Sequence, residues 1–418
     1  MEVIDRRAFL ASCIAATSSP HLLIAAPPGN ASHGAAPMSA VLDDPLRNGI
    51  ARRKIPAVVA MVAGPDRVLY MGAFGHRESD GPPLQLDSIF RIASMTKAVT
   101  TVAALQLVEQ GKVSLDEPVA RHLPQFKNVQ LLAGFDAQGE PILGPAVTPP
   151  TLRHLLTHTS GLCYDMWDPD MFRYTSKHPT ADNVPGPLIF EPGTRWQYGQ
   201  GLDWTGRLVE TVSGLTLEDY FQQNICTPLG MADTSFIFPA DKFERLVTNY
   251  HRNESGDLQQ DERKLPTAPK TFGGGGGLYS TAADYIRFMQ MILNQGLGPN
   301  GARVLRADTV AEMEVNQIGV LTPGKMKTQR PDLTSDVDMQ PGRTEKWSLG
   351  FLLNTTAYPG GRSAGSLAWA GLLNTYYWID PKRDLCAVIL MQYLPFADQR
   401  ALSLLGEFEQ AVYATKPS

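Results

Sequence analysis

The strongest constraint on the fold is that stretches typical of β-strands gather near both ends of the chain, with helical patterns between them. Near the start, AVVAMVAGPDRVLYMGAFG has two β-rich runs around Gly64, Pro65 and Asp66, which predicts a hairpin. Near the end, three segments each predict a strand: KWSLGFLLNT, SLAWAGLLNTYYWID and LCAVILMQY. Hairpin-type links at both ends favour antiparallel pairing. We therefore expect one antiparallel sheet assembled from both ends of the chain.

Helical patterns flank and interrupt this sheet. Apolar residues follow helical spacing from Ser94 to Gly111, LYSTAADYIRFMQMIL predicts a strand end followed by a capped helix, and DQRALSLLGEFEQAVYA predicts a closing amphipathic helix. The fold class expected is α/β (α+β), a sheet flanked by helices with an inserted, mainly helical region. The expected domains are an α/β domain from 38–112 plus 270–418 and a mainly helical domain from 113–269.

The first residues, 1–37, resemble an export signal with a flexible tail. Arg6 and Arg7 precede a mildly apolar stretch, and small residues and prolines follow, as in a twin-arginine signal. Export to the periplasm is therefore expected; a tail that happens to hold two arginines is the alternative. The stretch ending at Cys13 resembles a lipidation box, but it follows Arg7 by only about five residues, short of a ~7–15-residue signal core. Lipidation is therefore not expected.

Composition narrows the class of partner. The 418 residues are 43% hydrophobic and 19% charged, with a formal net charge of −5, which is ordinary for a globular protein. No basic stretch interleaved with aromatic residues occurs, so nucleic acid is not an expected partner. No apolar segment of membrane-spanning length follows the N-terminal stretch. Removing a signal would leave three of the four cysteines, which excludes a full disulfide framework.

The segment FRIASMTKAVT places Ser94 three residues before Lys97. If a helix begins there, both side chains lie on the same face, within reach of each other. The unpaired N–H groups of the first turn are available to a developing oxyanion. The helix dipole and partial burial both favour a neutral lysine, which can accept the serine proton. The alternative is a serine that caps the helix beside an incidental lysine.

Three other patterns compete for the chemistry. GRSAG (361–365) matches the nucleophile elbow of α/β-hydrolases, but that elbow requires a later histidine and all eight histidines precede Ser363. His154 and His158 have metal-ligand spacing, but they lack the glutamate of H-E-x-x-H and a third ligand. The glycine run 273–277 lacks the Lys-Ser/Thr of a phosphate-binding loop. We therefore expect a turn, structural histidines and close backbone packing, respectively.

Five motifs then occur in one order: FRIASMTKAVT, LLTHTSGL, PGTRWQYGQGLD, PLGMADTSF and GGGGGLYSTAADY. In this order they resemble serine β-lactamase-like proteins, a superfamily that contains penicillin-binding proteins, class C β-lactamases and family VIII carboxylesterases. The resemblance extends over roughly 45–415. It implies catalysis through an acyl-enzyme, without a cofactor or metal ion.

The resemblance assigns roles by motif position. Ser94 matches the nucleophile and Lys97 its base partner. Tyr198, in YGQ, matches the tyrosine that helps move the proton to the leaving group, so Lys97 and Tyr198 are expected to act as a coupled pair. Gln200 stands where class C enzymes have an asparagine and is expected to bind substrate.

The third family motif departs from the pattern. Trp369, Ala370 and Gly371 stand where β-lactamases and penicillin-binding proteins have Lys-Thr/Ser-Gly, and they are expected to contact substrate. The backbone N–H of Leu372 would then complete an oxyanion hole with that of Ser94, since both donors need only backbone. The cation that would bind a β-lactam carboxylate is missing, as in family VIII esterases.

The function expected is a serine hydrolase, foremost a carboxylesterase that acts on small esters. A β-lactamase, a D-amino-acid peptidase, an acyltransferase and a non-catalytic ligand-binding relative remain as alternatives. For the β-lactamase alternative, Arg343 or Arg362 would have to supply the missing cation. The oligomeric state and the natural substrate are left open.

Overall fold

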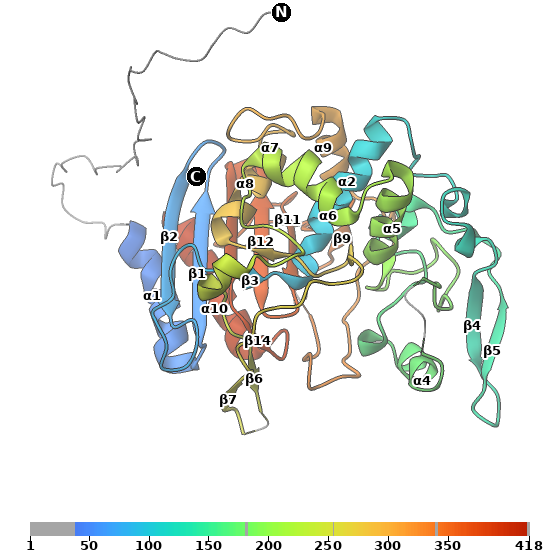
Figure 1. Cartoon of the computed structure of the whole chain (residues 1–418), viewed down its shortest axis with the longest axis horizontal. Coiled ribbons are helices and arrows are strands. Elements are labelled where there is room, and N and C mark those ends of the chain that lie inside the picture. The colour runs from blue at the N-terminus through green and yellow to red at the C-terminus, as the bar shows by residue number, and fades with distance from the viewer. Residues whose placement is uncertain (1–37, 180–182, 254, 339–341, 416–418) are drawn as a thin grey trace, which may run out of the picture. The chain divides into compact units, whose positions relative to one another are not determined.

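The predicted sheet from both ends of the chain is present. The computed structural model describes residues 38–179, 183–253, 255–338 and 342–415, which belong to one compact unit. Seven strands form a sheet in the order β2-β1-β13-β12-β11-β10-β9, in which every neighbouring pair is antiparallel (Figure 1). The strand β1 (Ala57–Ala63) lies between β2 (Val68–Gly75) and β13 (Leu385–Leu390), so the first and last strands of the sheet pair directly.

The C-terminal half of the sheet has more strands than the sequence predicts. The expected first strand is two short ones, β9 (Lys346–Trp347) and β10 (Leu352–Leu353), and the expected second strand is a hairpin of β11 (Leu367–Gly371) and β12 (Thr375–Asp380). The turn between β11 and β12 is not evident in the sequence, because it lies within a mostly apolar segment. In this turn, Asn374 takes a left-handed φ of 59°. Asparagine tolerates this conformation, and it lets the chain reverse within three residues.

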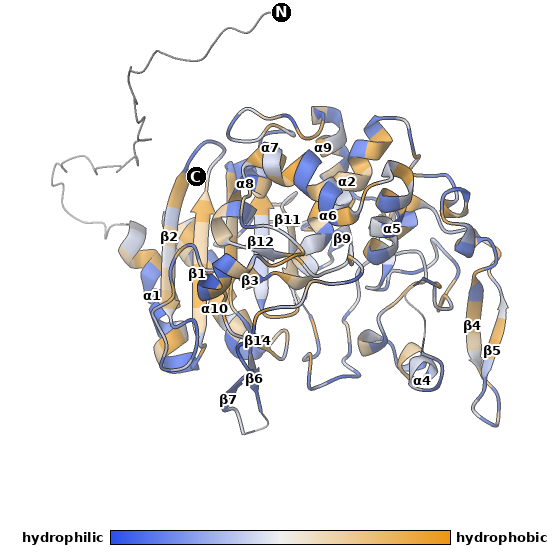
Figure 2. Cartoon of the chain, in the orientation of Figure 1, coloured by the Kyte–Doolittle hydropathy of each residue, from blue (hydrophilic) through white to orange (hydrophobic). Residues whose placement is uncertain are grey.

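Helices cover both faces of the sheet. The helices α1 (Met38–Arg53) and α10 (Gln399–Thr415) pack on one face, where Phe408 contacts Trp378. On the other face, Tyr285 of α8 (Ala282–Leu293) packs on Tyr377. Because successive side chains of a strand point to opposite faces, these neighbouring aromatic residues of β12 anchor different layers. Every residue of β1 is buried, and Figure 2 colours it hydrophobic.

The helix α2 (Thr96–Glu109) lies between the sheet and the helical region. Its residues from Thr96 to Leu107 are all buried, and it packs against α5 (Gly201–Ser213). Further helices are α3 (Leu152–Leu156), α4 (Pro169–Lys177), α6 (Leu217–Phe221), a π-helical turn (Gln222–Cys226), α7 (Thr227–Leu229) and α9 (Ala307–Met313). Two small two-stranded sheets are β3–β8 (Phe90–Arg91, Tyr279–Ser280) and β4–β5 (Gln130–Phe135, Pro141–Pro145). A three-stranded sheet has the order β14–β6–β7 (Tyr393–Leu394, Tyr250–Arg252, Leu258–Gln260). The predicted domain boundaries stay a prediction.

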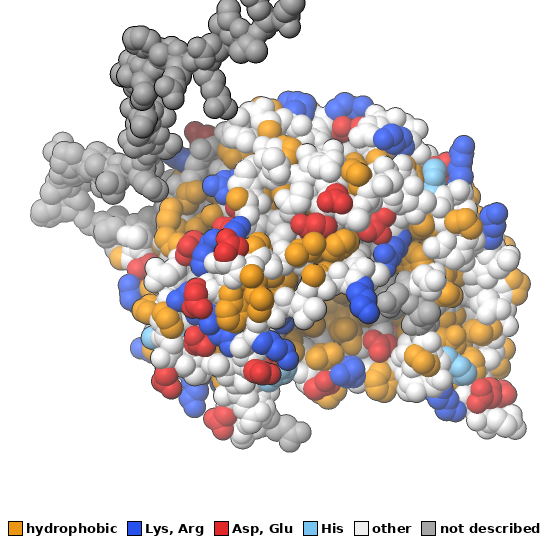
Figure 3. All heavy atoms as spheres, viewed as in Figure 1, with side chains coloured by type: hydrophobic (Ala, Val, Ile, Leu, Met, Phe, Trp, Pro, Cys, Tyr) orange, Lys and Arg blue, Asp and Glu red, His pale blue; other side chains and the backbone are white. Residues whose placement is uncertain are grey.

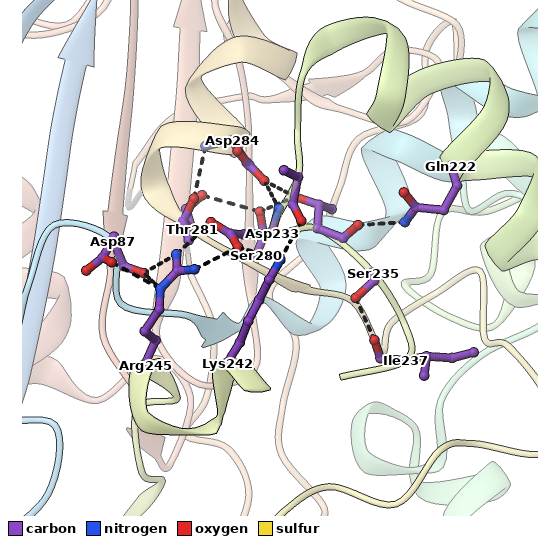
Figure 4. Close-up of polar contacts among 12 residues, drawn as sticks. Asp87, Gln222, Asp233, Ser235, Ile237, Lys242, Arg245, Ser280, Thr281 and Asp284 are labelled. Carbon is purple, nitrogen blue, oxygen red and sulfur yellow. Dashed lines mark hydrogen bonds and ion pairs between the residues drawn. The ribbon is translucent and has the colours of Figure 1, made fainter. Parts of the chain in front are cut away.

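A polar network holds α8 and the strand that precedes it (Figure 4). Asp233 binds Arg245 and Lys242, and its backbone N–H donates to the carboxylate of Asp284 on α8. Thr234 donates to the same carboxylate oxygen and shares a hydrogen bond with Ser280 of β8. Because β8 pairs with β3, this network fixes the strand that leads directly into the segment of Ser94.

Candidate active site

Ser94 lies where a turn of 3₁₀-helix (Ala93–Met95) continues into α2. The residue before it, Ala93, has a φ of 45°, a left-handed conformation that costs a non-glycine residue about 1–3 kcal/mol. Strain of this kind persists where the surrounding structure holds it, often at a functional site. Lys97 follows in the first turn of α2, and its Nζ lies 3.1 Å from Ser94 Oγ. The structure thus brings together the two residues of the S-x-x-K motif.

Lys97 is only 2% exposed and has two further hydrogen-bond partners. Its Nζ donates to the hydroxyl of Tyr164 at 3.1 Å and to the carbonyl of Gly275 at 2.6 Å. The Tyr164 hydroxyl donates to Asp203 Oδ2 at 2.7 Å, and Gly275 N–H donates to Asp203 Oδ1 at 2.9 Å. Sequence reasoning missed both Tyr164 and Asp203. The chain Asp203–Tyr164–Lys97–Ser94 is therefore continuous from a carboxylate to the serine.

The environment of Tyr164 keeps it in the phenol form. Burial raises its pKa well above the ordinary value, and the charge of Asp203 raises it further. Its proton lies toward Asp203, so its oxygen is left to accept from Lys97. Tyr164 therefore helps to hold Lys97 in place.

Tyr198 lies beside Lys97 with its ring close to the amine. Its ring centroid is 4.8 Å from Lys97 Nζ, while its hydroxyl accepts a hydrogen bond from Trp369 Nε1 at 3.2 Å. The indole N–H of Trp369 is thus directed at the tyrosine, and contact of Trp369 with substrate stays a prediction. The proton-transfer role of Tyr198 stays a prediction, with its hydroxyl oriented by Trp369.

The end of β11 lies against the segment that carries Ser94. Trp369, Ala370 and Gly371 are all buried in this strand. A Cβ atom added to Gly371 would come within 2.3 Å of the Ile92 carbonyl oxygen, so only glycine allows this close approach. Leu372 follows directly. The end of β11 thus packs against the turn that carries Ser94, and the oxyanion hole of Ser94 and Leu372 stays a prediction.

Two cavities are lined by residues that neighbour this cluster, although Ser94 and Lys97 are in neither lining. One, of about 380 Å³, is lined by Gln200, Cys163, Met171 and Phe172 among others, so the motif residue Gln200 and the aromatic segment 163–174 share one cavity. The other, of about 350 Å³, is lined by Trp369 and Trp196. Figure 3 shows hydrophobic side chains in a hollow between the α4 and β6 regions of the face in view.

The competing motifs have structural roles in the described residues. Ser363 lies in a turn ahead of β11 and donates its N–H to Asp380, which confirms the predicted turn. His154 forms a capping box with Thr151 at the start of α3. His158 accepts from Gly199 N–H through Nδ1, and burial, followed by the charge of Lys97, holds its pKa well below the ordinary value.

The glycine run packs closely, as predicted. A Cβ at Gly274 would come within 2.3 Å of the Leu202 carbonyl oxygen, and one at Gly275 within 2.4 Å of Asp203 Oδ2. Across the described ranges, no three His, Cys, Asp or Glu side chains gather as metal ligands would. In the same ranges, no helix is both long and apolar enough to cross a membrane.

Comparisons with known proteins agree with this architecture. A family model described as Beta-lactamase matches residues 42–408. An ML-236A carboxylate methylbutanoyltransferase of Penicillium citrinum is 33% identical over 92% of this chain and 96% of its own length. A lovastatin esterase of Penicillium rubens is 31% identical over 85% of this chain and 94% of its own length. The solved structure of a simvastatin synthase mutant from Aspergillus terreus has a TM-score of 0.81 at 33% identity, and the match covers 93% of this chain and 99% of that one.

The predicted periplasmic location is wrong. The relatives above that match along most of the chain are proteins of Penicillium and Aspergillus, and fungal cells have no periplasm enclosed by an outer membrane. The segment that suggested a twin-arginine signal, 1–37 with Cys13, lies outside the described residues.

Proposed function

Because the chain belongs to the beta-lactamase family, we propose that it is an acyltransferase that carries its acyl group as an ester on Ser94 and passes it to an alcohol. The similarity to a methylbutanoyltransferase over nine-tenths of the chain carries this proposal. It supports the acyltransferase alternative over the carboxylesterase that the sequence analysis placed first. The Ser94–Lys97 contact at 3.1 Å supports the acyl-enzyme in either case.

In the first half-reaction, Ser94 Oγ attacks the acyl carbonyl carbon of a donor ester. The serine proton passes to the neutral amine of Lys97, and the oxyanion is held by the N–H groups of Ser94 and Leu372. Collapse of the tetrahedral intermediate breaks the bond to the donor oxygen, which leaves with the proton. Tyr198, beside Lys97, is the expected route of that proton.

The second half-reaction repeats these steps with the acceptor in place of Ser94. The acceptor hydroxyl oxygen attacks the acyl carbon, its proton passes to Lys97, and the bond from carbon to Ser94 Oγ breaks. The proton then returns to Ser94. Water can replace the alcohol, in which case the same acyl-enzyme gives hydrolysis. Esterase activity is therefore the second candidate, and the similarity to lovastatin esterase favours it specifically.

The first test uses p-nitrophenyl butyrate as the acyl donor. Mass spectrometry of quenched protein is expected to find the butyryl group on Ser94, and added alcohol is expected to yield its butyrate ester. Ser94→Ala should abolish both products, whereas the matched variant Ser363→Ala should keep them. If release of p-nitrophenol continues in Ser94→Ala and stops in a folded Ser363→Ala, the acyl-enzyme assignment fails. If alcohols never form esters, the protein is an esterase.

The second test compares esters with a cephalosporin. Trp369 replaces the family's carboxylate-binding lysine, and a charge-assisted hydrogen bond is worth about 1.5–3 kcal/mol, or roughly 10- to 150-fold in selectivity. The two arginines that could compensate have other contacts: Arg362 binds Glu409 at 2.6 Å and Arg343 stacks on the Tyr358 ring. We expect kcat/KM for p-nitrophenyl butyrate to exceed that for nitrocefin. Faster nitrocefin turnover that disappears in Arg343→Ala would support a β-lactamase instead.

A further inference from the structure

The cavity of about 350 Å³ beside Trp369 has an apolar wall and one unusual polar group. Its volume falls within the ~300–1,000 Å³ range of small-molecule sites. Trp196, Met326, Val337, Leu352 and Trp369 supply apolar surface. Trp369 also donates to the Tyr198 hydroxyl, whose ring faces Lys97. A single side chain therefore belongs both to this cavity and to the catalytic cluster.

The charged side chains at the rim of the cavity already have partners. Lys325 and Asp338 form an ion pair at 2.9 Å. Arg343 lies 3.5 Å from the ring centroid of Tyr358 and donates to the Ala357 carbonyl. Because these side chains already have partners, the cavity is suited to an uncharged ligand.

Glu345 is the unusual group. It lines the cavity, and only 7% of it is exposed. Its Oε1 accepts from the Tyr358 hydroxyl at 3.0 Å, whereas its Oε2 is buried and has no hydrogen-bond partner among the described residues. Burial raises the pKa of Glu345 above the ordinary value. The hydrogen bond from Tyr358 and the charges of Arg362 and Arg343 act to lower it, but burial has the larger effect. A buried carboxyl oxygen without a partner is costly, so a ligand that donates to it gains affinity.

We propose that this cavity is the acceptor subsite and takes an uncharged, largely apolar alcohol with a second hydroxyl that donates to Glu345 Oε2. The proposal rests on the proposed acyl transfer from Ser94. The acyl chain itself is not the occupant, because a saturated chain has no donor for Glu345. One hydroxyl is held at Glu345, while the oxygen of the other attacks the acyl carbon; the bond from carbon to Ser94 Oγ breaks, and Lys97 returns the proton to Ser94.

The test compares two acceptors that differ only in the second hydroxyl, 1,4-cyclohexanedimethanol and (4-methylcyclohexyl)methanol, with p-nitrophenyl butyrate as donor. Sites built to bind a hydroxyl discriminate against the analogue that lacks it. We expect the diol to be acylated at least about tenfold faster per reacting hydroxyl, measured as the ratio of ester formed to butyrate released. In Glu345→Met this preference should fall below about twofold, because the acceptor oxygen is gone.

Two further variants separate recognition from folding. Glu345→Gln should keep part of the preference, since an amide oxygen can accept the same hydrogen bond. Glu314→Met is the matched control: Glu314 is also a partly buried glutamate whose pKa burial raises, but it lies at the end of α9 and binds Gln295. It should keep the full preference for the diol.

The outcomes distinguish a failure of the proposed subsite from a failure of the proposed acyl-enzyme. Equal transfer to both alcohols by the wild-type protein overturns the subsite while leaving the acyl-enzyme intact, and so does an unchanged preference in folded Glu345→Met. Failure to acylate Ser94 overturns the proposed function. In that event, crystals of the wild-type protein soaked with the diol still decide the cavity: a hydroxyl within hydrogen-bond distance of Glu345 supports the binding site, and an empty cavity excludes it.

Discussion

At the scale of single residues, the amine of Lys97 has three acceptors: Ser94 Oγ, the Tyr164 hydroxyl and the Gly275 carbonyl. An ammonium group has three N–H bonds, so the site matches the charged state that forms once Ser94 has given up its proton. In the neutral state, two N–H bonds can stay on Tyr164 and Gly275 while the lone pair faces Ser94. The same contacts thus orient the base before proton transfer and stabilise it afterwards.

Removing the support for this amine should slow acylation. We expect Tyr164→Phe and Asp203→Asn each to lower kcat for p-nitrophenyl butyrate by about 100-fold, because Lys97 loses an acceptor or that acceptor loses its orientation. The double variant should be little worse than either single one, because both break the same chain of hydrogen bonds.

The pH–rate profile distinguishes the positioning of Lys97 by Tyr164 and Asp203 from a general loss of structure. The variants should shift the profile along the pH axis while keeping the melting temperature of the wild-type protein within a few degrees. Losses that multiply in the double variant, or an unshifted profile, would show that Tyr164 and Asp203 do not act through Lys97.

Sequence distance decided which of these residues could be predicted. Ser94 and Lys97 share one helical turn, so their contact follows from spacing alone. Tyr164 is 67 residues from Lys97 and Asp203 lies on another helix, so only the folded chain brings them together. A signal was nevertheless present: Tyr164 lies two positions after the motif LLTHTSGL, and Asp203 is the last residue of the motif PGTRWQYGQGLD.

At the scale of elements, the glycine run beside α2 is the part of the site with the least room. The Gly275 backbone contacts Lys97 through its carbonyl and Asp203 through its N–H, and its missing Cβ leaves room for the Asp203 carboxylate. Close approach of backbone to a charged side chain is the reason for glycine at this position.

Gly275→Ala should therefore reduce activity far more than it reduces stability. The added Cβ would lie 2.4 Å from Asp203 Oδ2, so the carboxylate must move away from Tyr164 and Gly275. We expect kcat to fall by about 100-fold and the free energy of unfolding by about 1–3 kcal/mol. Gly144→Ala in β5 is the control, because its added Cβ has no neighbour within 4 Å. Equal activity of the two variants would contradict the role given to the loop.

Sequence patterns predicted the elements whose hydrophobic period, caps and turn residues all lie within the element itself. The β1–β2 hairpin, α2, α8 and α10 all follow from period, caps and turn residues. The helix α1 was not predicted because Pro45 lies inside it, although Leu42 and Leu46 are buried one turn apart on the same face. Packing against α10 and β2 forms it instead, and this is a tertiary contact that no short window of sequence contains.

At the scale of the whole molecule, a buried ion pair ties the closing helix to the sheet. Arg362, ahead of β11, binds Glu409 of α10 through two side-chain hydrogen bonds of 2.9 and 2.6 Å. Burial acts to raise the pKa of Glu409, but the charge and hydrogen bonds of Arg362 outweigh it and hold the pKa below the ordinary 4.5.

Glu409→Gln should cost about 3–5 kcal/mol of unfolding free energy at neutral pH, because it leaves Arg362 buried without its counter-charge. A lowered carboxyl pKa contributes stability that is present above the ordinary value and is lost as the pH falls through the folded one. The difference between variant and wild type should therefore narrow below pH 4.5. Urea unfolding at a series of pH values from 7 to below 4.5 measures this difference in unfolding free energy. The control is Asp308→Asn, which removes an exposed ion pair with Arg306 and should be as stable as the wild type at every pH. A difference that does not depend on pH would refute the assignment to the ion pair.

The pairing of β1 with β13 also sets the order of events during synthesis. Val59 lies opposite Leu390, so about 330 residues must leave the ribosome before β1 meets this neighbour. At roughly 5–20 residues per second, the wait lasts roughly 20 to 60 s. During that time an entirely apolar strand edge stays open to other nascent chains, a condition that favours aggregation. Production of this protein should therefore depend on chaperone supply and on translation speed far more than its folded stability would suggest.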